Sequence, residues 1–171
     1  MKVKSIPRLS IFIATIIILS TPLTTHNTEC TYFDDTEFKA VYIKKTEPSD
    51  LEQYKKDLDL LARLISSEAG NEPYMGKLAV GNVVMNRVKS SRFPNSIEGV
   101  VYAQGQFCVV RNGMINREAD QQSIDAAIDV LAGRRVIADD VVYFYNPKTA
   151  QDKWIRTRQV ASRHGNHNFA R

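Results

Sequence analysis

The sequence is poor in cysteine, since Cys30 and Cys108 are the only two in 171 residues. A small domain held together by several disulfides and a zinc site with four cysteine ligands are both excluded. No period of roughly 20–50 residues recurs, which excludes a solenoid or a propeller. Long hydrophobic runs are also lacking. The most apolar stretch, residues 9–19, is well short of the roughly 20 residues that a membrane-spanning helix needs.

The first residues have the pattern of an export signal. The basic residues Lys2, Lys4 and Arg8 precede the apolar stretch, and no acidic residue occurs before Glu29. We expect residues 1–25 to be a signal peptide, with an uncleaved membrane anchor as the alternative, and the protein to act outside the cytoplasm. Residues 26–48 show no sustained periodicity and are expected to form a linker or wrapping arm.

Neither sign of charge dominates once the expected signal is set aside. The chain has 23 basic and 19 acidic residues, and the signal accounts for three of the basic ones. A nearly neutral remainder gives no reason to expect a nucleic-acid partner. The charges are unevenly distributed, because residues 134–171 hold eight basic and three acidic residues. That basic part could face an anionic polymer or be an ordinary solvated surface.

Hydrophobic periodicity predicts a helix-rich domain over residues 49–171. The first helix begins at a capping box of Ser49 and Glu52 and ends at Gly70, for which we expect a left-handed conformation. Further helices are expected over residues 73–88, 95–102 and 120–132. In the second of the four helices, Gly76 and Gly81 are expected to permit close packing.

Strand signals come late in the chain. Residues 141–145 are β-branched or aromatic and precede the turn residues Asn146 and Pro147. Residues 154–155 and 159–160 are expected to be further short extended pieces. The predicted fold class is therefore α+β, with a helix-rich core and a small antiparallel sheet near the C-terminus.

One carboxylate lies where the first helix should be apolar. Leu58, Leu61 and Ile65 follow one another at spacings of three and four, and the next step of three reaches Glu68. Partial burial and the negative end of the helix dipole both disfavour the ionised form, so we expect a raised pKa, as a general acid requires. The alternative is a Glu at the rim that reaches water. Nearby Glu72 is expected to cap the second helix rather than to act in catalysis.

A series of motifs extends from this glutamate towards the end of the chain. It begins with L-I-S-S-E-A-G-N-E-P at 64–73 and continues with N-R-V at 86–88, R-F-P at 92–94, Q-F at 106–107, Y-F-Y-N-P at 143–147, Trp154 and G-N-H at 165–167. In this order, over residues 58–171, the motifs resemble the cell-wall hydrolase family of spore-cortex-lytic enzymes, the SleB/CwlJ type.

The resemblance implies a lysozyme-like core and a catalytic domain, residues 49–171, that attacks the glycan strands of peptidoglycan, in many members those of the spore cortex. It assigns the acid/base role to Glu68. Because no second carboxylate beyond Glu72 is obvious, we expect a lytic transglycosylase that cleaves between N-acetylmuramic acid and N-acetylglucosamine with a single Glu. The alternatives are a hydrolytic muramidase or glucosaminidase, and a non-catalytic cell-wall-binding module.

Eight further residues are candidates for binding the glycan, and most of them have a structural alternative. They are Asn86, Gln106, Phe107, Tyr143, Tyr145, Asn146, Trp154 and His167. Tyr143 and Tyr145 share one face of the expected strand and could contact sugars or the core. Trp154 is expected in the core more often than on a binding surface, and His167 is expected to be a structural hydrogen-bonding residue. Asn86 could hold a neighbouring backbone, Gln106 could brace its own loop, and Asn146 could simply form a turn.

No metal and no cofactor are expected. His164 and His167 are three residues apart, but no flanking acid completes a zinc motif. Cys108 is expected to be a small buried residue rather than a nucleophile. The expected partners are the glycan strands, with membrane contact only through the N-terminal segment and an accessory spore or wall protein as one source of targeting.

Overall fold

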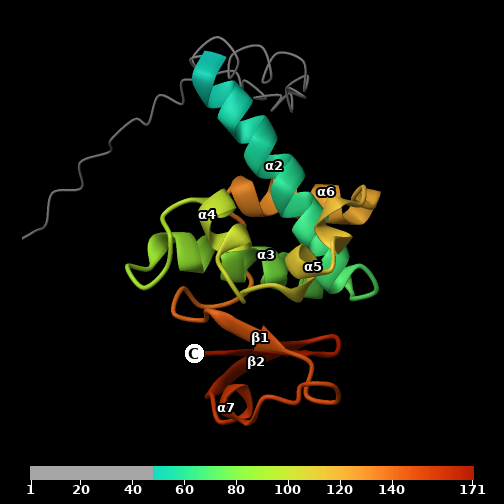
Figure 1. Ribbon diagram of the computed structural model, residues 1–171, viewed down its shortest axis with the longest axis vertical. Coiled ribbons are helices and arrows are strands. Elements are labelled where there is room, and N and C mark those ends of the chain that lie inside the picture. The colour runs from blue at the N-terminus through green and yellow to red at the C-terminus, as the bar shows by residue number, and fades with distance from the viewer. Residues whose placement is uncertain (1–47) are drawn as a thin grey trace, which may run out of the picture.

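Helices come first in the protein and a small sheet comes last. The computed structural model describes residues 48–171, so the expectations for the signal peptide and for nearly all of the arm lie outside the described residues. The elements are α2 (Pro48–Ala69), α3 (Tyr74–Lys89), α4 (Ile97–Tyr102), α5 (Cys108–Arg111), the 3₁₀ helix η1 (Met114–Asn116), α6 (Gln121–Leu131), β1 (Tyr143–Tyr145), α7 (Lys153–Arg156), β2 (Val160–His164) and β3 (His167–Ala170) (Figure 1). The predicted α+β class, with its late sheet, is confirmed.

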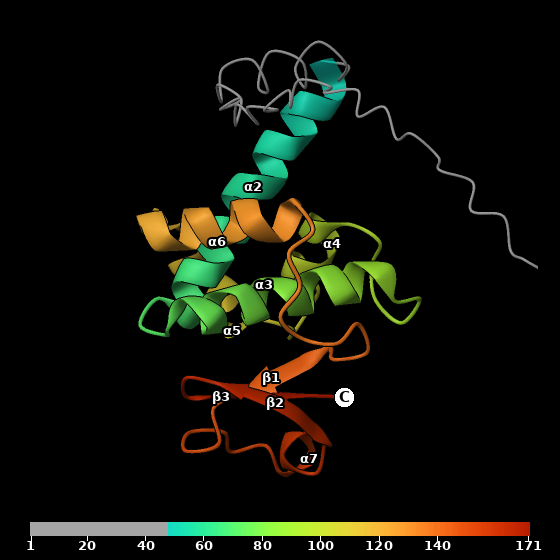
Figure 2. The same cartoon turned by 180° about the vertical axis from the view of Figure 1, so that it is seen from behind.

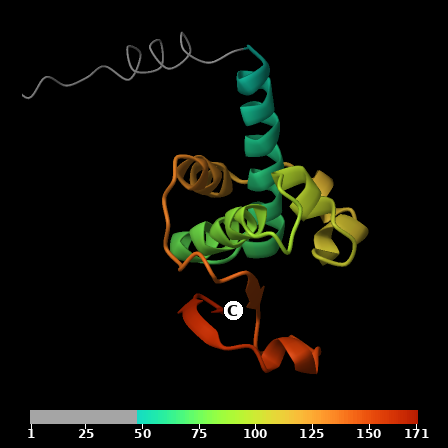
Figure 3. The ribbon, with the colours of Figure 1, turned by 90° about the vertical axis from the view of Figure 1, so that its left-hand side faces the viewer.

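The elements form two layers. Helices α2 to α6 make one layer, and the sheet together with α7 makes the other (Figure 1 and Figure 2). The N-terminal turns of α2 stand clear of the other helices (Figure 3). Among the helices that the structure describes, none combines the length and apolar character needed to cross a bilayer.

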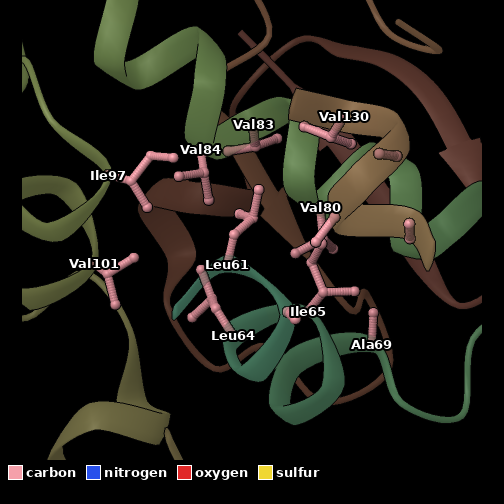
Figure 4. Close-up of a cluster of buried hydrophobic side chains, with 14 of the residues drawn as sticks. Leu61, Leu64, Ile65, Ala69, Val80, Val83, Val84, Ile97, Val101 and Val130 are labelled. Carbon is pink, nitrogen blue, oxygen red and sulfur yellow. The ribbon is translucent and has the colours of Figure 1, made fainter. Parts of the chain in front are cut away.

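Helices α2, α3 and α6 share the hydrophobic core. Side chains from all three helices are fully buried there: Leu61, Leu64, Ile65, Val80, Val83, Val84 and Val130 (Figure 4). The absence of a side chain at Gly81 lets the helices approach, because a Cβ there would lie 3.0 Å from Val130 Cγ2 and 3.1 Å from Ile65 Cδ1. The close packing predicted for this glycine is confirmed.

Both ends of α2 differ from the prediction. The helix already includes Pro48, a residue type suited to the first helical position, so Ser49 lies inside the helix and does not cap it. At the other end, Gly70 does not have a positive φ. It is needed for space instead, because a Cβ there would lie 2.6 Å from the backbone oxygen of Ser66.

Two shorter elements also differ. The cap of α4 is Ser96 rather than Asn95, and its side chain accepts a hydrogen bond from the backbone N–H three residues on. Residues 154–155, expected to be extended, belong to the helix α7. The side chain of Asp152 begins this helix by accepting a hydrogen bond of 2.8 Å from the backbone N–H of Trp154.

The sheet is antiparallel, with strand order β1-β3-β2. Phe144 pairs with Phe169, and the two rings stack with their centroids 6.0 Å apart on the face that joins the core. The next row across the sheet joins Tyr145 of β1, Asn168 of β3 and Arg163 of β2. Because side chains alternate along a strand, this second row faces away from the two phenylalanines.

A buried ammonium group connects the three main helices. Lys77 of α3 is buried, and its Nζ donates to both carboxylate oxygens of Asp120 at 3.0 and 3.1 Å and to Ser123 Oγ at 3.0 Å. Ser66 of α2 also donates to Asp120, at 3.0 Å. Burial raises the pKa of Asp120, but the hydrogen bonds from Ser123, Lys77 and Ser66 outweigh it and lower the pKa to about 2.

A second polar contact connects the two layers. Glu72, in the loop between α2 and α3, accepts hydrogen bonds from Asn166 N at 2.8 Å and Asn166 Nδ2 at 3.1 Å. Burial raises the pKa of Glu72, but these bonds and the nearby His167 bring it below its ordinary value. The predicted capping role of Glu72 is wrong, because α3 starts after Pro73 without a side-chain cap. Glu72 instead holds the turn between β2 and β3.

We expect Asp120→Ala to lower the free energy of unfolding at pH 7 by about 2 kcal/mol, because the Lys77 ammonium would stay buried without its carboxylate. The folded-state pKa of about 2 lies below the ordinary 3.8. The contribution of Asp120 is therefore complete above about pH 4 and is lost as the pH falls towards 2. Urea unfolding at several pH values measures this. Asp125→Ala, at an exposed position of α6, is the control. An Asp120→Ala deficit that does not shrink in acid would contradict the assignment.

We expect Gly165→Ala to disrupt the contact between the layers. Gly165 has a φ of +58°, and a Cβ there would collide with Glu72 Oε2. Gly113→Ala is a matched control, because Gly113 has a φ of +78° but nothing within 4 Å of its Cβ position. Backbone strain alone destabilises by about 1–2 kcal/mol, so Gly165→Ala should lose more than Gly113→Ala in urea unfolding. Equal losses would show that the Glu72 contact adds nothing.

Candidate active site

Glu68 lies in the last turn of α2, on the buried stripe that the sequence predicts. Leu61 and Ile65 on this stripe are fully buried, and Glu68 itself is half-buried. The two residues before it are fixed by other elements. Ser66 bonds to the N-cap of α6, and Ser67 Oγ donates to the backbone oxygen of Met114 at 3.1 Å. The turn that carries Glu68 is therefore held from two sides.

The carboxyl group of Glu68 is unusually easy to protonate. Burial raises its pKa from 4.5 to about 7, and the positive charge of Arg87 opposes the rise. Within residues 48–171, no hydrogen bond contributes to the shift. Near neutral pH the group is therefore present in both protonation states, as a side chain that first gives and then takes a proton requires.

Arg87, near the C-terminus of α3, is a rigidly held cation. Its Nε donates to the backbone oxygen of Val142 at 2.8 Å. Its guanidinium carbon lies 5.3 Å from the ring centroid of Phe93 and 5.1 Å from that of Phe107. These rings come from two different loops, and both attract a cation through their faces.

The charge of Arg87 acts on Glu68 without closing an ion pair. Burial lowers the pKa of Arg87 to about 10, while Tyr143 and Glu68 oppose the fall, so the guanidinium is charged at neutral pH. Its Nη1 is buried without a hydrogen-bond partner in the described part of the chain. Arg87 belongs to the N-R-V motif at 86–88, but the sequence did not predict this role. The role depends on two phenylalanines that meet Arg87 only in the folded protein.

Aromatic side chains extend from Arg87 along the inner face of the sheet. Phe107 is only 5% exposed, and its ring centroid lies 6.4 Å from that of Phe144. The ring of His167 meets Phe144 edge-on at 5.5 Å. Burial lowers the pKa of His167, so its imidazole is neutral at pH 7 despite Glu72 nearby. Two of the predicted binding residues, Phe107 and His167, therefore lie in one connected wall.

A second aromatic group lies on the outer side of the sheet. Tyr143 and Trp154 meet edge-on at 5.3 Å, and the Arg158 guanidinium lies 4.5 Å from the Trp154 ring centroid. Trp154 is 49% exposed, so the prediction that it lies in the core is wrong. It belongs to α7, which lies on the far side of the sheet from the helical layer (Figure 2). Tyr145 accepts a hydrogen bond from Asn168 Nδ2 at 3.2 Å.

The three polar candidates, Asn86, Asn146 and Gln106, lie in different environments. Asn86 is 1% exposed and donates to two backbone carbonyls, those of Ala138 and Val141, each at 2.9 Å. Asn146 Oδ1 accepts from the backbone N–H of Lys148, a turn contact. Gln106 is exposed. Asn86 and Asn146 are thus engaged with backbone, whereas Gln106 remains at the surface.

Cys108 is exposed, so the prediction of a buried residue is wrong. It begins the short helix α5, which the sequence did not predict. Together with Tyr102 and Arg111 it lines a surface pocket of about 400 Å³. Nowhere in residues 48–171 do three or more His, Cys, Asp or Glu side chains gather in a way that would hold a metal ion.

A surface cavity of about 670 Å³ does not include Glu68. It lies between α2 and the segment that leads into α6, with Leu58, Ala62 and Ile124 among its lining residues. None of the predicted site residues lines it. The candidate site is therefore identified by the carboxyl group, the nearby cation and the aromatic walls, and not by cavity volume.

We expect Glu68→Gln to stabilise the protein in alkaline solution. The folded-state pKa of about 7 lies above the ordinary 4.5. Stability that depends on the protonated form is therefore complete below about pH 4.5 and is lost as the pH rises through 7. A glutamine stays neutral and loses nothing. At pH 8.5 the variant should exceed the wild type by about 3 kcal/mol in urea unfolding, and at pH 4 the two should agree.

Glu118→Gln, at an exposed position, is the control for this measurement. Its stability relative to the wild type should not change with pH in the same way. A Glu68→Gln difference that stays constant from pH 4 to pH 8.5 would contradict a raised pKa at Glu68.

The sequence and the fold are similar to those of known proteins. A family model described as cell wall hydrolase matches residues 71–170, beginning three residues after Glu68. The spore cortex-lytic enzyme of Bacillus cereus is 34% identical over 117 residues, which are 68% of this chain and 45% of that protein. The cell wall hydrolase CwlJ of Oceanobacillus iheyensis is 35% identical over 105 residues, 57% of this chain and 74% of that protein.

Among solved structures, the catalytic domain of the germination-specific lytic transglycosylase SleB from Bacillus anthracis is similar, with a TM-score of 0.64 and 34% identity. The likeness covers 67% of this chain and 93% of that domain. The chain spans less than half the length of the spore cortex-lytic enzyme from Bacillus cereus. The family model covers more than half of the chain, and the chain belongs to the cell wall hydrolase family.

Proposed function

We propose that the domain cleaves the glycan strands of peptidoglycan between N-acetylmuramic acid and N-acetylglucosamine, as a lytic transglycosylase with Glu68 as its single acid and base. The observation that carries the proposal is a half-buried carboxyl group with a pKa of about 7 and no hydrogen bond that shifts it. Membership of the cell wall hydrolase family supports the substrate class.

The chemistry needs one side chain to act twice. Protonated Glu68 first gives its proton to the glycosidic oxygen, the bond from the anomeric carbon to that oxygen breaks, and positive charge develops at the anomeric carbon. The Glu68 carboxylate then accepts the proton of the C6 hydroxyl on the same sugar. The hydroxyl oxygen bonds to the anomeric carbon and closes a 1,6-anhydro ring. No water is consumed, and Glu68 ends protonated.

The surroundings of Glu68 favour one carboxylate over two. A two-carboxylate hydrolase holds its second Asp or Glu about 5–9.5 Å from the first. Among the charged groups of residues 48–171, only Arg87 shifts the pKa of Glu68, and no second carboxylate does so. Glu72, the nearest acid in the sequence, is engaged with Asn166.

Arg87 supports the second half of this cycle. When Glu68 has given up its proton, its negative charge remains in a partly apolar site. A fixed guanidinium nearby stabilises that anion without the reorganisation that mobile water would need. Because no ion pair within residues 48–171 holds Glu68, the carboxyl group can receive the next proton.

The exposed groups suggest where the substrate could bind. We expect the glycan to lie beside the buried wall that contains Phe107 and His167 and to contact the exposed side chain of Gln106. Because relatives are named spore cortex-lytic enzymes, spore cortex is the first substrate to test. Peptidoglycan lies outside the cytoplasmic membrane, so the proposed activity is extracytoplasmic.

We expect the wild-type protein to release fragments with anhydromuramyl ends from purified cortex, and Glu68→Gln to reduce that release about 1,000-fold while the fold is kept. Mass spectrometry of the fragments from cortex and from vegetative peptidoglycan measures both. Glu72→Gln is the matched control and should keep activity within about tenfold, because that carboxylate holds a turn.

Other results would overturn parts of the proposal. Free reducing ends would indicate hydrolysis by a muramidase or glucosaminidase. Binding to peptidoglycan without any fragments would indicate a wall-binding module. Full activity in Glu68→Gln would remove Glu68 from the mechanism.

A further inference from the structure

Positively charged side chains are concentrated in the part of the chain that forms the sheet and α7. Residues 143–171, which we name the sheet lobe, contain six Lys and Arg residues and one Asp. Three of these cations already have partners. Arg171 pairs with a carboxylate, Arg156 donates to two backbone carbonyls, and the Arg158 guanidinium lies over an aromatic ring. Lys148, Lys153 and Arg163 form no ion pair within the described chain. The sheet lobe therefore presents cations that its own acidic residues do not neutralise.

Two of these cations line one pocket. Lys148, at the start of the loop after β1, and Arg163, on β2, border a pocket of about 320 Å³. The other lining residues are Pro147, Gly165, Asn166 and Asn168. This volume is at the small end of ligand sites, so it suits one or two residues of a ligand rather than a run of sugars.

The amide groups of the pocket offer acceptors. Asn168 lies between Tyr145 and Arg163 in one row across the sheet, and its Nδ2 donates to the tyrosine hydroxyl. Asn166 directs both its backbone and its side-chain N–H groups at Glu72. The side-chain oxygens of these two asparagines accept no hydrogen bond within the described chain. The pocket therefore combines two cations with two amide oxygens.

Two cations together with two amide oxygens favour some anionic ligands over others. A guanidinium and an ammonium bind a carboxylate through charge-assisted hydrogen bonds. The amide oxygens in turn need N–H donors, which a peptide supplies and a phosphodiester link lacks. Peptidoglycan carries short peptides on its muramic acid residues, and these peptides have free carboxylates. Peptide and glycan belong to the same molecule.

The pocket is tied to the end of the catalytic helix. Asn166 lines the pocket and is held by Glu72, which is four residues after Glu68 in the sequence. A ligand in the pocket would therefore be bound at a fixed place relative to the turn that carries Glu68. This coupling gives the pocket a way to select which strands reach the acid.

We propose that the pocket lined by Lys148 and Arg163 binds a carboxylate of the peptide on muramic acid, so that the domain prefers glycan strands that bear peptides. This specificity rests on the proposed glycan cleavage. It adds a second point of recognition, separate from the acid and from the aromatic walls.

The test compares two substrates made from one preparation of peptidoglycan, freed of phosphodiester polymers with hydrofluoric acid. One keeps its peptides, and the other has lost them through an N-acetylmuramoyl-L-alanine amidase. The full chain, a Lys148→Gln/Arg163→Gln variant and a Lys55→Gln/Lys56→Gln control are assayed on both. The control removes the same charge from exposed positions of α2. The single variant Lys148→Gln guards against an effect of the β2 substitution on folding.

We expect the KM of the pocket variant to rise about tenfold on peptide-bearing strands, since hydrogen bonds to charged groups are lost. On stripped strands the variant should equal the wild type, and the control should equal the wild type on both. Equal losses on both substrates, or no loss on either, would overturn the proposal. So would a loss seen only when phosphodiester polymers are retained, which would identify those polymers as the ligand.

Failure of the proposed function is distinguishable from failure of this inference. If the wild type releases no fragments from either substrate, glycan cleavage fails. Co-sedimentation of the wild type and the pocket variant with the two insoluble substrates then measures binding alone. Weaker binding of the variant, confined to the peptide-bearing material, still supports the pocket. Equal binding of both proteins to both materials overturns it.

Discussion

The rest of the site depends on a carboxyl group that is held at the edge of an apolar core and has no hydrogen bond from the described part of the chain to fix its charge. Burial of the ionised form is unfavourable, so Glu68 retains its proton to a much higher pH than an exposed glutamate does. Neighbouring elements hold the turn of α2 that carries Glu68 in this position. Ser66 bonds to the N-cap of α6 and Ser67 to the backbone of η1, and both hydrogen bonds oppose unwinding of the helix end that carries Glu68.

Arg87 limits the rise in the pKa of Glu68. Its positive charge acts on the carboxyl group, although the two side chains form no ion pair. A closer guanidinium would hold the carboxylate ionised and remove the acid. With no cation at all, the carboxylate left after proton transfer would be harder to form. The position of Arg87 is set by Phe93, Phe107 and the carbonyl of Val142, which come from three separate segments. The acidity of one side chain is therefore a property of the whole tertiary structure.

The sequence predicts those features that depend on local spacing. The helices α2, α3 and α6 and the half-buried position of Glu68 follow from apolar residues three and four apart. The errors that concern the site and its surroundings fall where distant segments decide. Glu72 looks like a helix cap until the turn between β2 and β3 arrives beside it. Trp154 looks like a core residue because nothing local indicates that α7 lies outside the sheet, and Arg87 has no local feature that distinguishes it from other helical arginines.

The order of the strands has a consequence for biosynthesis. β1 and β2 each pair with β3 and not with each other, although β3 follows both of them in the sequence. A nascent chain therefore cannot assemble this sheet until β3 has left the ribosome. The helices can gather around Glu68 earlier, but the opposite wall is still missing. The sheet side of the candidate site is therefore complete only when β3 has paired with both of its neighbours.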